Sequence, residues 1–478
     1  MLMERKYFYW LIVSAVWCQT LFAQPSGTQP PDSNSITVTD PELLVGEITI
    51  TGNKKTKPYI ILREIPFQSG ETYTLKDLVK KFEQARRQLM NTALFHTVVV
   101  FASRYEGSTV HIAVELKERW YLFPLPSFKL VDRNLNQWLV EQKASLTRVN
   151  YGIKIVHNNA TGRNDKFNFM LINGYSRQFS VSYRRAYIDK HLKWGMNAGL
   201  GVGKIREVNY NTVNDKQVFL KDNDEFNRSF VWANIGLTYR RAIQTRHHFG
   251  IAYSAETVGD SVVTLNPNYF KNGHKQMNFP TLYYTMDYSD VDYIPYPTKG
   301  YTGQVALSKS GFGKGYNCWQ INVKAMGSWH LSKKLFYSLQ AFGGLKLPLK
   351  QPYFNQRFLG YGENYLQGYE YYVIDGSAGG YLKATLYRRL LDFHIKLPPR
   401  KKGKDPERIP ISIVSKIYGN TGYVHNPSPG ENLLSNKMLY SGGIGIDIVT
   451  IYDITFKLEW SFNQLGQNGL FLHRRSIF

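Results

Sequence analysis

The sequence has little cysteine and no long apolar run. Only two cysteines occur among its 478 residues, and Cys18 lies in a segment that we expect to be removed, so Cys318 has no partner for an internal disulfide. Beyond residue 24 no window approaches the ~18 uninterrupted apolar residues of a membrane helix. These absences exclude a disulfide-stabilised fold and argue against a helical membrane protein.

The common catalytic and metal-binding motifs are also missing. The chain contains no His-Glu-x-x-His, Cys-x-x-Cys or phosphate-binding loop. Ser377 lies in DGSAG, one glycine short of a nucleophile elbow. His247 and His248 begin a predicted strand, where adjacent side chains point to opposite faces and cannot readily chelate one metal. We therefore expect a protein that is not an enzyme and that has no catalytic residue, metal or cofactor.

The amino-terminal residues predict export. Arg5 and Lys6 precede an apolar run over residues 7–17, and cleavage could follow the small residue Ala23, with Leu21 larger than the usual residue at the minus-three position. The run is shorter than the ~20 residues that a membrane helix needs. We interpret residues 1–23 as a signal peptide and the segment 24–43, rich in Pro, Ser, Thr and Asn, as a flexible linker.

Aromatic residues and positive charge are abundant. Aromatics make up 15% of the chain, including 34 Tyr, and the formal net charge is +23. The charge alone could indicate nucleic-acid binding, but an exported protein is not expected to meet nucleic acid. Lipopolysaccharide and the anionic head groups of outer-membrane lipids are the partners that this charge favours. The aromatic excess fits a barrel wall, where Tyr and Trp ring the membrane interfaces.

Residues 44–118 predict a small α/β unit with the order β-α-α-β-β. Pro58 stands at an early position of a short helix, where its missing N–H costs little. Thr74 and Asp77 form a capping box ahead of a longer helix. The strands are expected at 45–51, 97–101 and 110–116.

From residue 121 onward, apolar and polar residues alternate as in strands with two different faces. In ITFKLEWSFN (454–463) the polar face carries a Lys and a Glu at mid-strand, which suits a water-filled lumen. Sixteen such segments begin near 121, 151, 166, 178, 193, 228, 247, 277, 301, 318, 335, 380, 411, 438, 453 and 469. We predict an all-β transmembrane barrel of sixteen antiparallel strands over 119–478. A soluble all-β protein such as a propeller is the alternative, and the export signal and the lack of repeats disfavour it.

Four motifs occur in order along the chain. The α/β unit contains GNKKTKPYIILREI and a later ALF. The residues of the other three are Asp292, Pro297, Thr298 and Gly300 in DYIPYPTKG, Leu366, Gln367, Gly368 and Tyr369 in LQGY, and 418–424 in YGNTGYV. In this combination the chain resembles the BamA/TamA-type outer-membrane assembly family, which is related to two-partner secretion transporters. The resemblance covers residues 44–478 and implies that 44–118 is one POTRA domain.

The resemblance also implies that LQGY is the tip of an external loop that folds into the lumen. In the family a loop-tip arginine is held by acidic residues of the barrel wall. Here the arginine position is Gln367 and the wall positions are Thr385 and Asn420, with Gly422 nearby. We expect the tip to lie in the barrel near these residues, with neutral hydrogen bonds in place of a charged cluster. The alternative is that loop and wall do not touch.

The carboxyl end, GLFLHRRSIF, resembles the terminal signal by which barrel proteins are recognised, with Gly469, Phe471 and Phe478 as its residues. The resemblance implies that the last strand pairs with the first and that this seam opens sideways. The last strand alternates poorly, so we expect its lower half to be frayed. The basic run 398–410 is expected in a periplasmic turn, either as a solvated loop or as an anchor for phosphates or an acidic partner.

These observations predict an outer-membrane insertase or translocase with its POTRA domain in the periplasm. It would assemble or export proteins through a laterally opening barrel and capture unfolded outer-membrane or secreted clients by β-augmentation. Periplasmic lipoproteins are possible further partners. A dedicated two-partner secretion pore, a barrel enzyme that acts on lipids and a passive porin are the alternatives.

Overall fold

The computed structural model describes residues 41–130, 149–221, 225–313, 315–396, 408–450 and 453–475. The described residues from Leu43 onward belong to one compact unit, which carries an α/β domain and a large β-sheet. The predicted signal peptide, most of the predicted linker, residues 398–407 of the basic run and Phe478 lie outside the described residues. None of the helices in the described ranges is long and apolar enough to cross a membrane.

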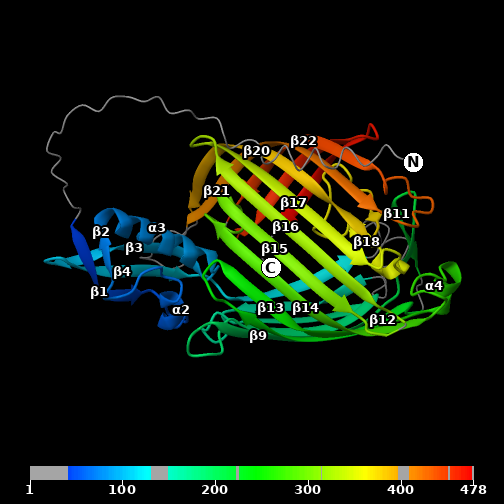
Figure 1. Ribbon diagram of the computed structural model, residues 1–478, viewed down its shortest axis with the longest axis horizontal. Coiled ribbons are helices and arrows are strands. Elements are labelled where there is room, and N and C mark those ends of the chain that lie inside the picture. The colour runs from blue at the N-terminus through cyan, green and yellow to red at the C-terminus, as the bar shows by residue number, and fades with distance from the viewer. Residues whose placement is uncertain are drawn as a thin grey trace, which may run out of the picture. The chain divides into compact units, whose positions relative to one another are not determined.

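The α/β domain is a four-stranded sheet covered by two helices (Figure 1). Its elements are β1 (Glu42–Thr51), α2 (Pro58–Leu62), β2 (Thr72–Thr74), α3 (Leu75–Asn91), β3 (Phe95–Glu106) and β4 (Thr109–Glu118). The sheet order is β2-β1-β4-β3. Its core is formed mainly by Val45, Ile60, Ile61, Leu78, Ala85, Leu89, Phe95, Val110, Ile112 and Val114.

The predicted helix signals of this domain are confirmed. Pro58 stands in the first turn of α2. The Thr74 hydroxyl accepts a hydrogen bond from the Asp77 backbone N–H at 3.2 Å, which caps α3. The strand β2 was not predicted, because three residues are too few to show an alternating pattern.

Sixteen strands follow and form one antiparallel sheet that curves into a barrel (Figure 1). They are β5 (Leu122–Leu130), β6 (Val149–Asn158), β7 (Lys166–Gly174), β8 (Ser176–Arg185), β9 (Trp194–Ile205), β12 (Arg228–Tyr239), β13 (Thr245–Val258), β14 (Gln276–Val291), β15 (Gly300–Ser310), β16 (Cys318–His330), β17 (Leu335–Leu347), β20 (Ala378–Lys396), β21 (Arg408–His425), β22 (Met438–Val449), β23 (Thr455–Asn463) and β24 (Asn468–Arg475). The predicted strand number is confirmed. The largest error in a strand start is at β21, expected at 411 and observed at 408.

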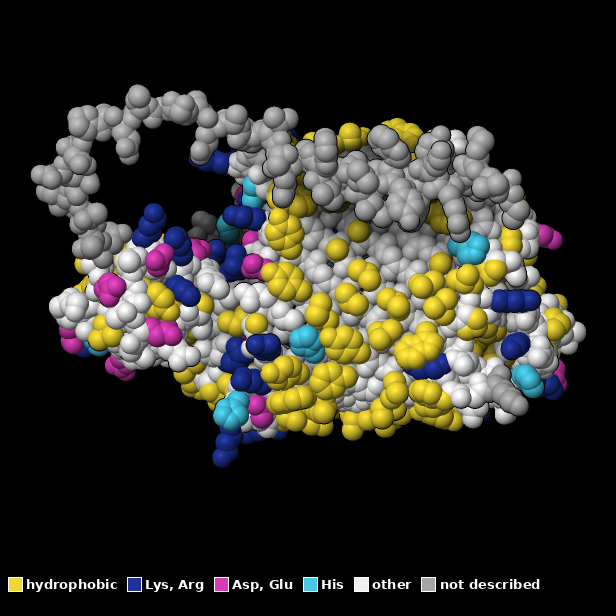
Figure 2. Space-filling model, viewed as in Figure 1, with side chains coloured by type: hydrophobic (Ala, Val, Ile, Leu, Met, Phe, Trp, Pro, Cys, Tyr) yellow, Lys and Arg dark blue, Asp and Glu magenta, His cyan; other side chains and the backbone are white. Residues whose placement is uncertain are grey.

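The alternation predicted for the barrel strands appears in their burial. In β23 the side chains of Phe456, Leu458 and Trp460 are 40–47% exposed on the outer face, whereas those of Glu459 and Ser461 are fully buried inside. Figure 2 shows hydrophobic side chains spread over the outer face of the strands, with charged side chains mainly towards their ends. This outer surface is the kind that faces lipid.

Several short elements at the barrel end away from the α/β domain were not predicted (Figure 1). They are β10 (Val208–Val213), β11 (Lys216–Leu220), α4 (Asp260–Leu265), η3 (Tyr353–Asn355), β18 (Arg357–Leu359) and β19 (Ile374–Asp375). Buried aromatic residues join these connections, among them Tyr269, Phe270 and Tyr353. The Asp215 carboxylate accepts hydrogen bonds from the backbone N–H groups of Leu433 and Leu434. The strand connections at this end therefore pack against one another.

Candidate functional site: a loop tip in the barrel lumen

The connection between β17 and β20 enters the barrel and buries its tip there. The side chains of Leu366 and Tyr369 are each only 2% exposed, and that of Gln367 is 9% exposed. Gly368 has a φ of +90°, and a Cβ there would lie 3.0 Å from the carbonyl oxygen of Phe462 in β23. Only glycine adopts this conformation at so close an approach without strain.

The tip contacts the inner face of β21, β22 and β23. A Cβ at Gly422 would lie 2.8 Å from Cδ1 of Leu366, so the leucine occupies the space that this glycine leaves. Asn463 Nδ2 donates to the Gly368 carbonyl at 2.7 Å, and the Tyr369 hydroxyl donates to the Tyr440 carbonyl at 3.1 Å. The structure thus brings Leu366 and Gly422 together.

Gln367 enters a network of buried charges. Its Nε2 donates to Glu459 Oε1 at 2.9 Å. Lys416 Nζ lies 2.5 Å from Glu459 Oε1 and 2.5 Å from Asp447 Oδ1, and the three charged side chains are at most 1% exposed. The Tyr296 hydroxyl donates to Asp447 Oδ2 at 3.0 Å. We call the five residues Tyr296, Gln367, Lys416, Asp447 and Glu459 the lumen network.

The neutral hydrogen bonds that we expected between Gln367 and the wall residues Thr385 and Asn420 are not the ones that the described residues make. Asn420 Nδ2 donates to Ser441 Oγ at 3.1 Å rather than meeting Gln367. Thr385 and Gln367 line one cavity of about 500 Å³, and no hydrogen bond joins them among the described residues. A charged cluster is present, but at other wall positions: Lys416 on β21, Asp447 on β22 and Glu459 on β23. A buried lysine already pairs with both carboxylates, and the tip adds a neutral amide donor.

Sequence reasoning missed this network, although one signal was available. Lys416, Gly445 and Glu459 are direct neighbours across β21, β22 and β23. A Cβ at Gly445 would lie 2.8 Å from Lys416 Cε, so the glycine leaves room for the ion pair. A lumen-facing lysine and glutamate on either side of a glycine would have predicted the pair once the strand register was known.

The motif DYIPYPTKG builds the turn between β14 and β15. The Asp292 carboxylate accepts hydrogen bonds from the Thr298 backbone N–H at 2.9 Å and the Thr298 hydroxyl at 2.5 Å. Gly300 has a φ of +107°, which favours glycine. Pro297 lines the same 500 Å³ cavity as Gln367 and Thr385. The four predicted residues therefore shape the turn, and the turn reaches the lumen.

Tyr296 connects this turn to the lumen network. Besides its bond to Asp447, its ring contacts the rings of Phe336 and Tyr387, with centroids 6.3 and 6.0 Å away. On its other side the turn is bound to α3, because the Ile294 backbone N–H donates to Asn91 Oδ1 at 3.0 Å. One turn thus contacts both the α/β domain and the lumen.

A buried ion pair also joins the α/β domain to the barrel. Arg240, between β12 and β13, donates to Glu64 through both terminal nitrogens, at 2.8 Å for Nη2. The Tyr187 hydroxyl donates to Glu64 Oε1 at 3.1 Å. Burial alone would raise the pKa of the Glu64 carboxyl, but Arg240 outweighs it and holds this pKa below its usual value.

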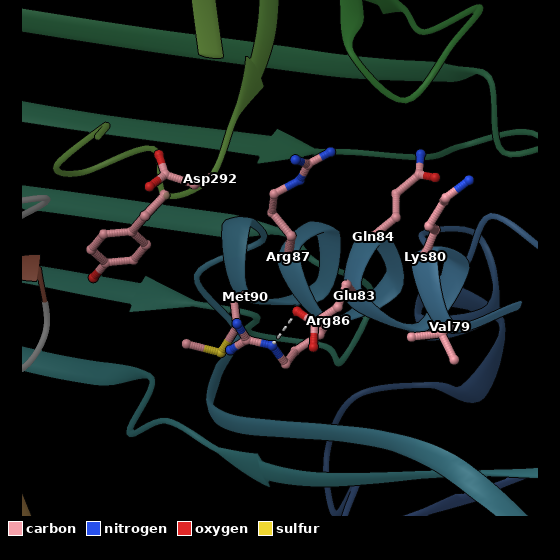
Figure 3. A pocket seen from close by; sticks show the side chains of 9 residues that line it. Val79, Lys80, Glu83, Gln84, Arg86, Arg87, Met90 and Asp292 are labelled. Atoms are coloured by element: carbon pink, nitrogen blue, oxygen red, sulfur yellow. Dashed lines mark hydrogen bonds and ion pairs between the residues drawn. The ribbon is translucent and has the colours of Figure 1, made fainter. Parts of the chain in front are cut away.

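Side chains of α3 line a surface groove of about 710 Å³ together with Asp292 and Tyr293 (Figure 3). Arg86 pairs with Glu83 at 3.4 Å inside the helix, and Arg87 Nη2 lies 3.3 Å from Asp290 of the barrel. The groove is therefore lined by charges that are already partly paired.

The last strand, β24, pairs with β23 from Asn468 to Arg475, with Phe471 opposite Glu459. This pairing with β23 continues to Arg475, the last described residue, so the lower half that we expected to be frayed or weakly paired shows no fraying on this side within the described residues. Gly469 pairs with Ser461. β24 and β5 stand at the two ends of the sheet order, and no ladder joins them within the described ranges.

Known proteins share parts of this sequence and this fold. The POTRA family model, surface antigen variable number repeat, matches residues 43–119. The structure of BamA from Haemophilus ducreyi lacking POTRA domains 1–3 matches with a TM-score of 0.51, at 13% identity, over 90% of this chain and 83% of that one. The chain has a POTRA domain and a BamA-type barrel. The resemblance to BamA/TamA-type proteins predicted from sequence is thus confirmed at the level of fold.

Two CdiB structures are also similar to the chain. CdiB from Escherichia coli matches at 10% identity and a TM-score of 0.46, over 94% of this chain and 92% of that one. CdiB from Acinetobacter baumannii matches at 12% identity and a TM-score of 0.48, over 89% and 71%. No curated protein shows a significant sequence match to the chain.

Proposed function

We propose that this protein is an outer-membrane barrel that inserts or exports proteins by opening between β5 and β24, with its POTRA domain in the periplasm. The observation that carries this proposal is the loop tip, which the lumen network fastens to β21–β23. The tip stiffens the wall that precedes β24 and leaves the edge of the sheet as the part that can move. Clients are unfolded outer-membrane or secreted proteins.

The proposed mechanism is strand addition at the edge of β24. An unpaired backbone N–H or C=O group costs several kcal/mol in lipid, so an opened edge is strongly favoured to pair with an incoming strand. The outward side chains of Leu470 and Leu472 are 66% and 72% exposed. They offer an apolar surface beside which the outer face of a client strand can pack.

The sidedness that we propose follows from strand parity. With an even number of strands, the α/β domain, the turn 292–299 and the basic run 398–410 share one side, the periplasm. The connections that contain α4, β11 and β18 then face outside. Anionic lipid head groups and periplasmic lipoproteins are proposed as further partners, on the strength of the net charge of +23.

A dedicated secretion pore would use the lumen instead of the seam. The lumen holds the loop tip, whose residues Gln367, Gly368 and Tyr369 are hydrogen-bonded to β22 and β23. Passage through it requires these bonds to break, and this favours the seam as the route. A passive porin would also need the loop tip to leave the lumen.

Cysteine pairs placed across the seam test the mechanism. Single cysteines are introduced over 122–128 of β5 and 468–472 of β24, and combinations that form a disulfide on oxidation are kept. A photoreactive residue at position 471 reports client crosslinking in cells. We expect the oxidised pair to lose client crosslinks at unchanged membrane abundance and to regain them on reduction. Each single-cysteine variant serves as the control. Equal crosslinking in the oxidised and reduced states would overturn lateral opening.

A further inference from the structure

We propose that Glu370, Glu459 and His473 form a binding site for a divalent transition metal, with Zn²⁺ as the best fit. The three ligands come from three elements: the loop just after its tip, β23 and the last strand, β24. A bound ion would fasten the loop directly to the strand that borders the seam. The sequence reading predicted no metal, because these residues lie far apart along the chain.

The spacing of the three side chains suits a small tetrahedral ion. His473 Nε2 lies 3.3 Å from Glu370 Oε1 and 3.3 Å from Glu459 Oε2. All three ligand atoms lie within 4.8 Å of one another. Zinc bonds to nitrogen and oxygen of ~2.0–2.1 Å place tetrahedral ligands about 3.3 Å apart. Two of the three ligand–ligand distances already have this length, and the third, between the two carboxylates, is at most 4.8 Å.

Hydrogen bonding does not account for this arrangement. A single Nε2 of His473 has one hydrogen to donate, yet two carboxylates converge on it. Glu459 Oε2 is buried and accepts no hydrogen bond, whereas Glu459 Oε1 accepts from Lys416 and Gln367. When the single hydrogen goes to Glu370 Oε1, the fully buried Glu459 Oε2 faces Nε2 at 3.3 Å with no hydrogen to accept, which is a sign of a missing ligand.

Neighbouring groups hold the ligands in the orientation that a metal needs. The Gly368 backbone N–H donates to Glu370 Oε2 at 2.8 Å and leaves Oε1 directed at His473. The ring of His473 stacks on that of Tyr365, with centroids 5.0 Å apart. In metalloproteins, contacts of this kind hold the metal-binding side chains in their orientation. Each of the three proposed ligands is therefore positioned by a second interaction.

The surroundings admit a cation and favour a transition metal over Ca²⁺ or Mg²⁺. Two carboxylates match the charge of a divalent ion, and Lys416 is balanced by Asp447. Lys383 and Lys457 also line the cavity next to His473 and weaken the attraction. The cavity of about 500 Å³ leaves room for water as a fourth ligand. An imidazole nitrogen in the ligand set is what selects zinc over the oxygen-binding cations.

Titration of the purified full-length protein with Zn²⁺ tests the site. The protein is stripped with a chelator in detergent, and binding is measured by competition with a chromophoric chelator. We expect one tight site per chain, weakened at least 10-fold in Glu370→Gln and in His473→Ala. Glu370→Gln keeps the acceptor for the Gly368 N–H, so its fold is preserved. His191→Ala, at an exposed loop histidine, is the matched control for adventitious binding. Absence of tight binding, or tight binding that both site variants retain, would overturn the proposal.

The effect of the metal on the seam rests on the proposed function and is tested separately. Reaction of the seam cysteine pairs with a bifunctional thiol reagent is followed with and without Zn²⁺. We expect Zn²⁺ to slow this reaction several-fold in the wild-type background and not in Glu370→Gln, because the ion restrains β24. If zinc binds but does not change this rate, the metal site stands and its role at the seam is wrong. If zinc does not bind, lateral opening remains to be judged by the disulfide experiment alone.

Discussion

Lys416 is the residue whose removal tests the lumen network most directly. Its Nζ lies 2.5 Å from both Asp447 Oδ1 and Glu459 Oε1, and neither carboxylate side chain is exposed to solvent. Lys416→Met keeps the length of the side chain and removes the charge. It leaves one hydrogen bond from Tyr296 to Asp447 and one from Gln367 to Glu459. We expect the free energy of unfolding to fall by about 3–5 kcal/mol, as for other buried ion pairs that lose one partner.

The assay is urea unfolding of the barrel in lipid vesicles, followed by tryptophan fluorescence. Lys324→Met is the matched control, because Lys324 also faces the lumen but has no ion pair in the described part of the chain, and it should cost less than about 1 kcal/mol. In a double-mutant cycle, Glu459→Gln should recover part of the loss in Lys416→Met, with a coupling of about 1–3 kcal/mol. A loss below about 1 kcal/mol in Lys416→Met, or no coupling, would refute the reasoning.

Three further perturbations follow from the same contacts. Gln367→Arg places a second cation beside Lys416 and should destabilise the barrel. Adding Lys416→Met should restore stability, because the arginine can then pair with Glu459. Failure of this rescue in the urea assay would contradict the assigned pairing. Gly368→Ala should cost about 1–3 kcal/mol because its φ is +90°, seen as faster proteolysis of the loop in intact vesicles. Glu64 has a lowered folded pKa, so its ion pair with Arg240 stabilises the fold above the unfolded value of 4.5 and loses this contribution as pH falls below it. Glu64→Gln should remove that acid-dependent component of the unfolding free energy, and an unchanged pH profile would contradict it.

The barrel could be predicted from sequence because each strand carries its own signal. Alternation in ITFKLEWSFN separates Leu458 and Trp460 from Glu459 and Ser461 without knowledge of any neighbour. The Thr74 cap of α3 is local in the same way. The number of strands and the start of the helix could therefore be predicted from short windows of sequence.

The pairing inside the lumen could not be predicted, because it depends on strand register and on where one loop ends. Lys416 meets Glu459 only through the neighbouring β22, and Gln367 reaches them from a connection 30 residues long, 348–377. The family resemblance directed attention to Asn420, whereas the lysine of the network lies four residues earlier on the same strand, at Lys416. The strands β10 and β18 were missed because they are short and are held by other loops.

The turn between β14 and β15 is a thermodynamic link between two distant parts of the molecule. Asn91 binds it from the POTRA domain, and Tyr296 binds it to Asp447 in the lumen. Because linkage is reciprocal, a ligand at the POTRA domain that weakens the hold on the loop tip must bind less tightly when the tip is held, by the same free energy. Through this turn, a molecule bound at the POTRA domain would act on the lumen network without touching it.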